Sequence, residues 1–125
     1  MMDAMYFQSK EFESPDLPGS GELMDFDFIA LLDQCRHRAG MPFVVNSGYR
    51  TANHQDKLKK EGYPVSENSA HLIGKAADIR CRNSSERYLI LGAAVSVGFT
   101  RIGIGKNFIH LDTAEDKGGP FIWIY

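Results

Sequence analysis

Two short stretches of the sequence hold side chains of the types that bind a metal ion. His71 and Asp78 lie seven positions apart in a segment rich in small residues, and His110 follows 32 residues after Asp78. Imidazole nitrogen and carboxylate oxygen both bind zinc at about 2.0–2.2 Å, and a catalytic zinc site takes three protein ligands and leaves one position open. Each histidine alone would more often be structural. Together, the three residues predict a zinc site built for hydrolysis, because zinc makes a bound water acidic and polarises a carbonyl group beside it.

A further carboxylate, Asp112, lies two positions after His110. Side chains two apart on a strand point to the same face, so His110 and Asp112 should project together while Ile109 and Leu111 enter the core. Asp112 could accept a proton from the attacking water as a general base. It could equally orient the His110 ring through its second nitrogen. We predict the base role and leave the orienting role open.

Other residues are candidates for contact with a substrate. Arg50 follows an apolar strand and a glycine turn, a position from which a guanidinium can bind a carboxylate or a developing oxyanion. A surface ion pair is the alternative for Arg50. Ser69 either hydrogen-bonds a ligand or fixes the loop before His71. Tyr49 and Trp123 are aromatic residues that could line a groove, although the core is the commoner place for such a tryptophan.

The elements that must position these residues follow from periodicity and from helix-ending residues. Apolar residues at helical spacing predict a helix from about residue 23 to 38, with Gly40 as its cap and Pro42 beyond it. Asn83 and Glu86 have the spacing of a capping box, which begins a helix that Gly98 ends. A shorter helix is expected between residues 51 and 62.

Strands are expected at 43–46, 74–80, 99–102, 108–112 and 121–125. The third and fourth should form a hairpin through a glycine-rich turn. The pattern predicts one α+β domain, with an antiparallel sheet and helices packed on one side. Residues 1–22 are expected to be an irregular lead-in with turns, and residues 23–125 the domain itself.

The composition is that of a globular protein. The chain has 125 residues, of which 43% are apolar and 24% charged, and its net charge is −2. Without a basic block, nucleic acid is not an expected partner. No apolar run is long enough for a membrane span, and the N-terminus has no secretory signal pattern. We expect a monomer.

The two cysteines, Cys35 and Cys81, do not have the spacing of a zinc pair. We interpret them as buried thiols that behave as small apolar groups, with a disulfide as the less favoured alternative.

Three motifs together resemble the zinc D-Ala-D-Ala carboxypeptidase family of metallopeptidases. They are Ser47-Gly-Tyr-Arg50-Thr, Ser69-x-His71-x-x-Gly74-x-Ala76-x-Asp78 and Phe108-Ile-His110-Leu-Asp112. That family includes cell-wall endopeptidases of bacteria and phages, and its fold is similar to the hedgehog signalling domain. The resemblance implies zinc held by His71, Asp78 and His110, with Arg50 assisting the substrate or transition state. It also implies D-amino-acid-containing stem peptides of peptidoglycan as the substrate.

One position departs from that family's pattern. Many relatives carry a catalytic acid three residues before the last zinc ligand, where this chain has Asn107, whose amide cannot serve as a base. This departure moves the expected base to Asp112. It also supports an alternative, an inactive binding module stabilised by zinc. A metal-free structural protein of a phage particle is a third reading. The sequence does not distinguish carboxypeptidase from endopeptidase action, nor delivery by a phage from secretion by a bacterium.

Overall fold

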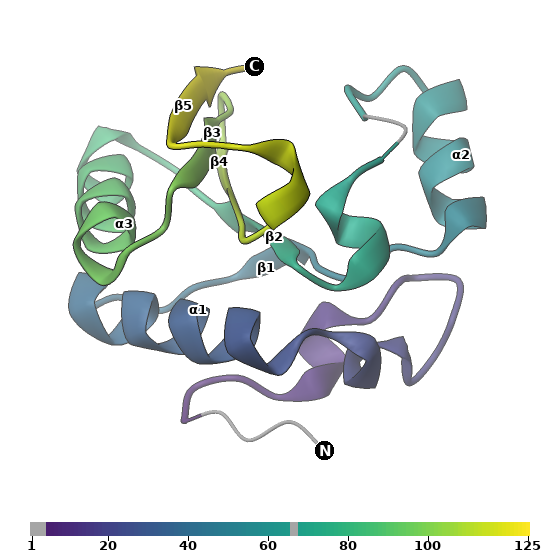
Figure 1. The fold of residues 1–125 in the computed structure, drawn as a ribbon, viewed down its shortest axis with the longest axis horizontal. Helices are drawn as coiled ribbons and strands as arrows, with labels where there is room; N and C mark the ends of the chain where they lie inside the picture. Colours follow the sequence, from purple (N-terminus) through teal and green to yellow (C-terminus); the bar gives the residue numbers. More distant parts are fainter. Residues whose placement is uncertain (1–4, 66–67) are drawn as a thin grey trace.

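The structure is a computed structural model that describes residues 5–65 and 68–125. It contains α-helices, short 3-10 helices (η) and strands that form one sheet (Figure 1). The α-helices are α1 (Phe26–Ala39), α2 (Ala52–Lys60) and α3 (Ser84–Val97). The strands are β1 (Val45–Ser47), β2 (Ala76–Arg80), β3 (Arg101–Ile104), β4 (Phe108–Asp112) and β5 (Phe121–Ile124). The 3-10 helices are η1 (Ser9–Phe12), η2 (Ser20–Leu23), η3 (Ala70–Ile73) and η4 (Glu115–Lys117).

The sheet has the strand order β1-β2-β4-β3-β5, which puts β2 and β4 next to each other near its centre. The first four strands pair antiparallel, and β3 and β4 form the expected hairpin. However, β5 pairs parallel with β3, so the sheet is mixed and the prediction of a purely antiparallel sheet was wrong. After β4, the chain passes through η4 and returns beside β3, so that β5 runs in the same direction as β3. The alternation of apolar and polar residues predicts a strand but not its direction relative to its neighbour.

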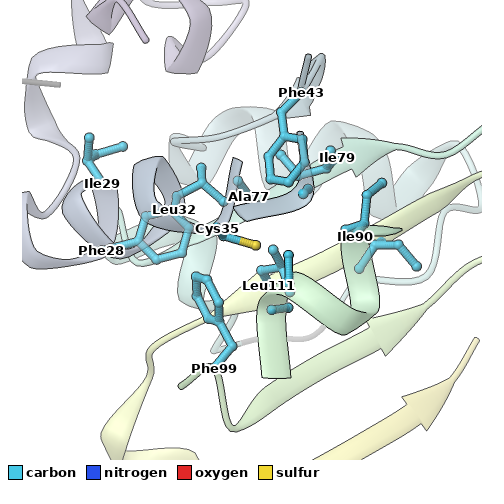
Figure 2. Close-up of a cluster of buried hydrophobic side chains, with 14 of the residues drawn as sticks. Phe28, Ile29, Leu32, Cys35, Phe43, Ala77, Ile79, Ile90, Phe99 and Leu111 are labelled. Carbon is cyan, nitrogen blue, oxygen red and sulfur yellow. The ribbon is translucent and has the colours of Figure 1, made fainter. Parts of the chain in front are cut away.

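Helices α1 and α3 pack against each other and against one face of the sheet (Figure 1). Their apolar residues meet the inward side chains of β2 and β4 in a single buried cluster (Figure 2). It includes Phe28, Leu32, Cys35, Ala77, Ile79, Ile90, Phe99, Ile109 and Leu111. Because alternate residues of a strand face opposite sides, the residues between these inward ones lie on the other face of the sheet. That other face carries the candidate site.

Helix α1 begins later than predicted. The Asp25 side chain accepts a hydrogen bond from the Phe28 N–H at 3.0 Å and so caps the helix, whereas Leu23 ends the separate turn η2. At the other end, Gly40 has φ 68°, the left-handed conformation expected of a C-cap glycine. Helix α3 begins at the predicted cap, because the Asn83 side chain accepts from the Glu86 N–H at 2.9 Å.

The N-terminal segment, expected to be irregular, forms the two turns η1 and η2. Its Phe7 and Phe12 are buried in the same cluster as the helices and strands. The Phe12 carbonyl accepts a hydrogen bond from the Tyr49 N–H at 2.8 Å. A Cβ atom at Gly48 would lie 2.8 Å from Phe12 Cα. The N-terminal segment therefore packs directly against the loop that leads to Arg50 and is hydrogen-bonded to it.

Both cysteines are buried and neither forms a disulfide, as the interpretation of the sequence had it. Burial raises the pKa of the Cys35 thiol to about 12, so this group remains an uncharged part of the core. No helix in the described part of the chain has the length and apolar character needed to cross a membrane.

Candidate metal centre

Strand pairing places two of the predicted ligands directly opposite each other. In the register of β2 and β4, Asp78 lies across from His110, and Ala77 and Ile79 lie across from the core residues of β4. Cross-strand partners have their Cβ atoms about 4.5–5.5 Å apart on one face of the sheet. The hydrogen bond from His110 Nδ1 to Asp78 Oδ1, 2.8 Å long, follows from this register.

The third predicted ligand, His71, comes from the 3-10 turn η3. Ser69 caps this turn, because its hydroxyl oxygen accepts from the His71 N–H at 3.2 Å. The turn ends at Gly74, whose φ of 71° suits glycine and whose carbonyl accepts from the Asp25 N–H at 2.9 Å. The 2%-exposed side chain of His71 thus enters the site from the segment before β2.

The three side chains converge on one point. His71 Nε2 lies 3.4 Å from Asp78 Oδ1, and one potential ligand atom from each of His71, Asp78 and His110 lies within 4.8 Å of the others. Two atoms that are each about 2.0–2.2 Å from one tetrahedral zinc ion lie about 3.3–3.6 Å apart, which the separation of His71 Nε2 and Asp78 Oδ1 matches. The two imidazole rings meet edge to face, with their centroids 5.2 Å apart.

The remaining polar atom of each group has a protein partner that fixes its orientation. His71 Nδ1 donates to the Gly48 carbonyl at 2.7 Å. Asp78 Oδ2 accepts from Arg50 Nη2 at 3.1 Å. His110 Nε2 donates to Asp112 Oδ2 at 2.7 Å. Metal ligands in proteins are held by partners of this kind, so the donor set and its surroundings fit a zinc ion.

The pKa shifts follow from burial and from the close charges. Burial acts to raise the pKa of Asp78, but the charges and hydrogen bonds of His71 and His110 outweigh it, and the pKa lies well below its ordinary value. Burial lowers the pKa of His71, which favours the neutral ring that a metal needs. Burial also acts to lower the pKa of His110, yet the carboxylates of Asp112 and Asp78 on either side raise it. A cation that binds here therefore competes with a proton on His110.

Asp112 lies on the side of the His110 ring away from Asp78. Its Oδ1 accepts from Arg101 Nε at 2.7 Å and from the Ala114 N–H at 3.1 Å, while its Oδ2 is bonded to His110. The carboxylate is 2% exposed. With both oxygens engaged in this way, the geometry favours the orienting role over the base role that the sequence predicted.

Arg50 is 9% exposed and lies under the cluster. Its guanidinium donates to Asp78, to the Ser47 hydroxyl at 3.0 Å and to Gln55 Oε1 at 3.2 Å. The alternative of an ion pair on the surface is wrong, because this pair is buried beside the candidate ligands. Arg50 holds Oδ2 of Asp78, and Oδ1 is the oxygen that faces His71 and His110.

The cluster opens into a cavity of about 480 Å³. Of the predicted site residues, Arg50, Ser69, His71, Asp78, His110 and Asp112 line it. Tyr49 is not among the lining residues; it is half-buried and packs against the core cluster. Trp123 has its ring 5.5 Å from that of His110, so it forms a wall of the cavity, and its placement in the core was wrong.

The cavity residues that were missed in the sequence include three polar ones, Arg101, Lys117 and Tyr125. Arg101 pairs with Asp112 across the β3–β4 hairpin, and its guanidinium lies 5.1 Å from the Trp123 ring centroid. The predicted hairpin could have revealed this pair, because the first residue of β3, Arg101, lies opposite the last residue of β4, Asp112. Lys117 and Tyr125 reach the cavity only through the η4 connection and the parallel pairing of β5.

Comparison with known proteins agrees with this geometry. A family model described as Peptidase M15 matches residues 6–112. The chain belongs to the Peptidase M15 family. No curated protein matches it. Among solved structures, it is similar to the Serratia marcescens L-Ala D-Glu endopeptidase ChiX, with a TM-score of 0.57 and 19% identity over 77% of this chain and 85% of that chain. At this identity the likeness supports the fold alone.

The match confirms the family that the sequence motifs implied, the zinc D-Ala-D-Ala carboxypeptidase-like peptidases. The matched range contains every residue of the metal cluster and ends at Asp112. Lys117, Trp123 and Tyr125 lie after it, so the part of the cavity wall that they form is outside the matched range.

Proposed function

We propose that the protein is a zinc-dependent peptidase that hydrolyses the stem peptides of bacterial peptidoglycan. The observation that carries the proposal is the convergence of His71, Asp78 and His110 in a cavity, each with its other polar atom held by the protein. The family match supports peptide hydrolysis. The substrate is proposed from the sequence motifs, and the L-Ala D-Glu endopeptidase that shares the fold is consistent with it.

In this proposal, the chain's residues divide the work. His71, Asp78 and His110 would hold the zinc ion, which would supply a Lewis acid for the peptide carbonyl and lower the pKa of water. Arg50 keeps Asp78 charged and aimed, and lines the cavity where it can donate to an oxygen of the bound peptide. Asp112 holds the His110 ring in the orientation that points Nδ1 at the cluster. Ser69 acts by fixing the turn that carries His71.

Endopeptidase action suits the shape of the site better than carboxypeptidase action. A second cavity of about 440 Å³, beside the first, shares Arg101 and Asp112 in its lining. A peptide bound across both cavities would lie on both sides of the cleaved bond, as an internal cut requires.

The test is digestion of purified peptidoglycan followed by mass spectrometry of the released muropeptides. We expect new amino termini at one type of bond, with activity lost on chelation and restored by zinc. The mass of the fragments identifies the bond. Unchanged digestion after complete removal of metal would rule out zinc dependence.

A specific observation favours a second candidate, an inactive binding module stabilised by zinc. Asn107 replaces the acid found in many relatives, and it is exposed in the β3–β4 turn, outside the lining of the cavity. Among the described residues, the two carboxylates that line the cavity, Asp78 and Asp112, already have partners for both oxygens. This candidate predicts one zinc ion per chain and binding of stem peptides, with no turnover under any condition.

A further inference from the structure

The cavity has more cationic than anionic side chains. Arg50, Arg101 and Lys117 line it, against the carboxylates of Asp78 and Asp112. A bound divalent cation would add to the positive charge. Clefts lined by one sign of charge attract ligands of the opposite sign, and low-dielectric walls strengthen the effect.

Two of the three cations are already paired at the bottom of the cavity. Arg50 lies 3.1 Å from Asp78, and Arg101 lies 2.7 Å from Asp112. The side chains of both arginines are almost fully buried, at 10% and 12% exposure. Their charges are therefore balanced by the groups that hold the metal ligands.

Lys117 differs from both arginines. It is half-buried at the end of η4, on the wall of the cavity. Within residues 5–65 and 68–125, its ammonium group has no hydrogen bond and no ion pair, although Glu115 and Asp116 precede it in the chain. The cavity wall thus carries a cation with no partner of its own.

The backbone of Lys117 is nevertheless held in place. Arg101 Nη1 donates to the Lys117 carbonyl at 3.1 Å and to the Gly118 carbonyl at 3.2 Å. The same guanidinium donates to Asp112, which in turn holds His110. Arg101 therefore fixes the lysine relative to the metal cluster, while the side chain of the lysine stays available to a ligand.

We propose that Lys117 binds a free carboxylate of the substrate, next to the bond that is cleaved, and so determines which peptides the site accepts. The inference rests on the proposed function. A lysine ammonium provides a full charge and three N–H donors, and a charged hydrogen bond to a carboxylate is among the stronger ones. In a stem peptide, this carboxylate is either the α-carboxylate of a D-Glu joined through its side chain, or the carboxylate of a terminal D-Ala.

Two pairs of synthetic peptides test the proposal. The first pair is L-Ala–D-Glu–L-Lys, joined through the D-Glu side chain, with the α-carboxylate either free or converted to the carboxamide. The second pair ends in D-Ala–D-Ala with a free or amidated terminus. Equilibrium binding and kcat/KM are measured for wild type, Lys117→Ala and Lys117→Arg. Lys60→Ala is the control, because it removes the same charge from an exposed position of α2 that is not among the residues lining this cavity.

We expect wild type to prefer the peptide with the free carboxylate in one of the two pairs. Lys117→Ala should lower the affinity and kcat/KM for that peptide about tenfold and leave the values for its amide unchanged. Lys117→Arg should restore most of the preference, and Lys60→Ala should leave it unchanged. The pair that discriminates identifies the source of the carboxylate. An equal loss for acid and amide, or no loss for either, would overturn the proposal.

The binding measurements separate this proposal from the proposed function. If wild type cleaves none of the peptides, the proposed activity fails, and the ratio of acid to amide affinity still decides the role of Lys117. If wild type cleaves acid and amide equally well, the peptidase activity stands and the carboxylate site is excluded.

Discussion

The centre of the sheet and its edge are built in opposite ways. At the centre, His71, Asp78, His110 and Asp112, here called the floor, are buried or nearly so, and each is held by further hydrogen bonds. At the edge, β5 pairs with one strand only, and its Ile122 and Ile124 are 58% and 73% exposed. Lys117, Trp123 and Tyr125, here called the rim, come from η4, from β5 and from the position directly after β5, and they line the same cavity as the floor.

The difference suggests a division of function. A metal site needs ligands fixed to a fraction of an ångström, which buried strand pairing and complete hydrogen bonding provide. Substrate selection depends on side chains that are accessible and have free bonding capacity. Changes in the floor should therefore alter metal binding or folding, whereas changes in the rim should alter which peptides bind.

The largest effect is expected from Asp78→Asn. The amide removes the charge from the ligand set and leaves the buried Arg50 without its ion pair. We expect loss of zinc and a fall in kcat/KM on the order of a thousand-fold or more. Metal analysis and peptide hydrolysis measure the two effects together. Full activity without bound zinc would contradict the role of the floor.

Asp112→Asn tests how the floor is held. If Asp112 orients His110, the zinc affinity should fall by about 10- to 100-fold, and excess zinc should restore much of the activity. If Asp112 is the general base, the affinity should remain and kcat should stay low at any zinc concentration. A competition titration with a coloured chelator, with kcat measured at saturating zinc, distinguishes the two roles.

Gly74→Ala should destabilise the support beneath His71. The residue has φ 71°, and an added Cβ would lie 2.5 Å from the Leu23 carbonyl oxygen. We expect a loss of about 2 kcal/mol or more in the free energy of unfolding, measured with urea. The control is Gly92→Ala within α3, where a Cβ meets nothing within 4 Å. That variant should gain about 0.5–1 kcal/mol.

The smallest effect is expected in the rim. Trp123→Ala removes a ring that packs against His110 and Arg101, and should lower kcat/KM by roughly three- to tenfold, mainly through KM. The zinc content should not change. Ile122→Ala, on the opposite face of the same strand, should leave both quantities unaltered. A loss of zinc in Trp123→Ala would show that the rim and the floor are not separate.

The floor was more predictable from the sequence than the rim. The alternation in Phe108–Asp112 placed His110 and Asp112 on one face and Ile109 and Leu111 in the core, as the structure has them. Local signals also identified the Asn83 and Gly40 caps. These features depend on residues close together in the chain.

The rim depends on contacts between distant segments. Gly103 falls in the turn predicted between residues 102 and 108, but it lies within β3, where a Cβ would come within 2.7 Å of the Trp123 and Tyr125 side chains. The glycine makes room for these two rings. The spacing of the glycines does not distinguish a glycine inside a strand from one in a hairpin turn, so β3 was expected two residues too early. The direction of β5 depends on the path of the chain after β4, so its parallel pairing was also missed.

The central claim is that His71, Asp78 and His110 share one zinc ion. Anomalous X-ray scattering at the zinc edge, from crystals grown with zinc, tests it most directly. We predict one strong peak per chain, about 2.0–2.2 Å from His71 Nε2, Asp78 Oδ1 and His110 Nδ1. A peak elsewhere on the chain, or none at these three side chains, would contradict the account.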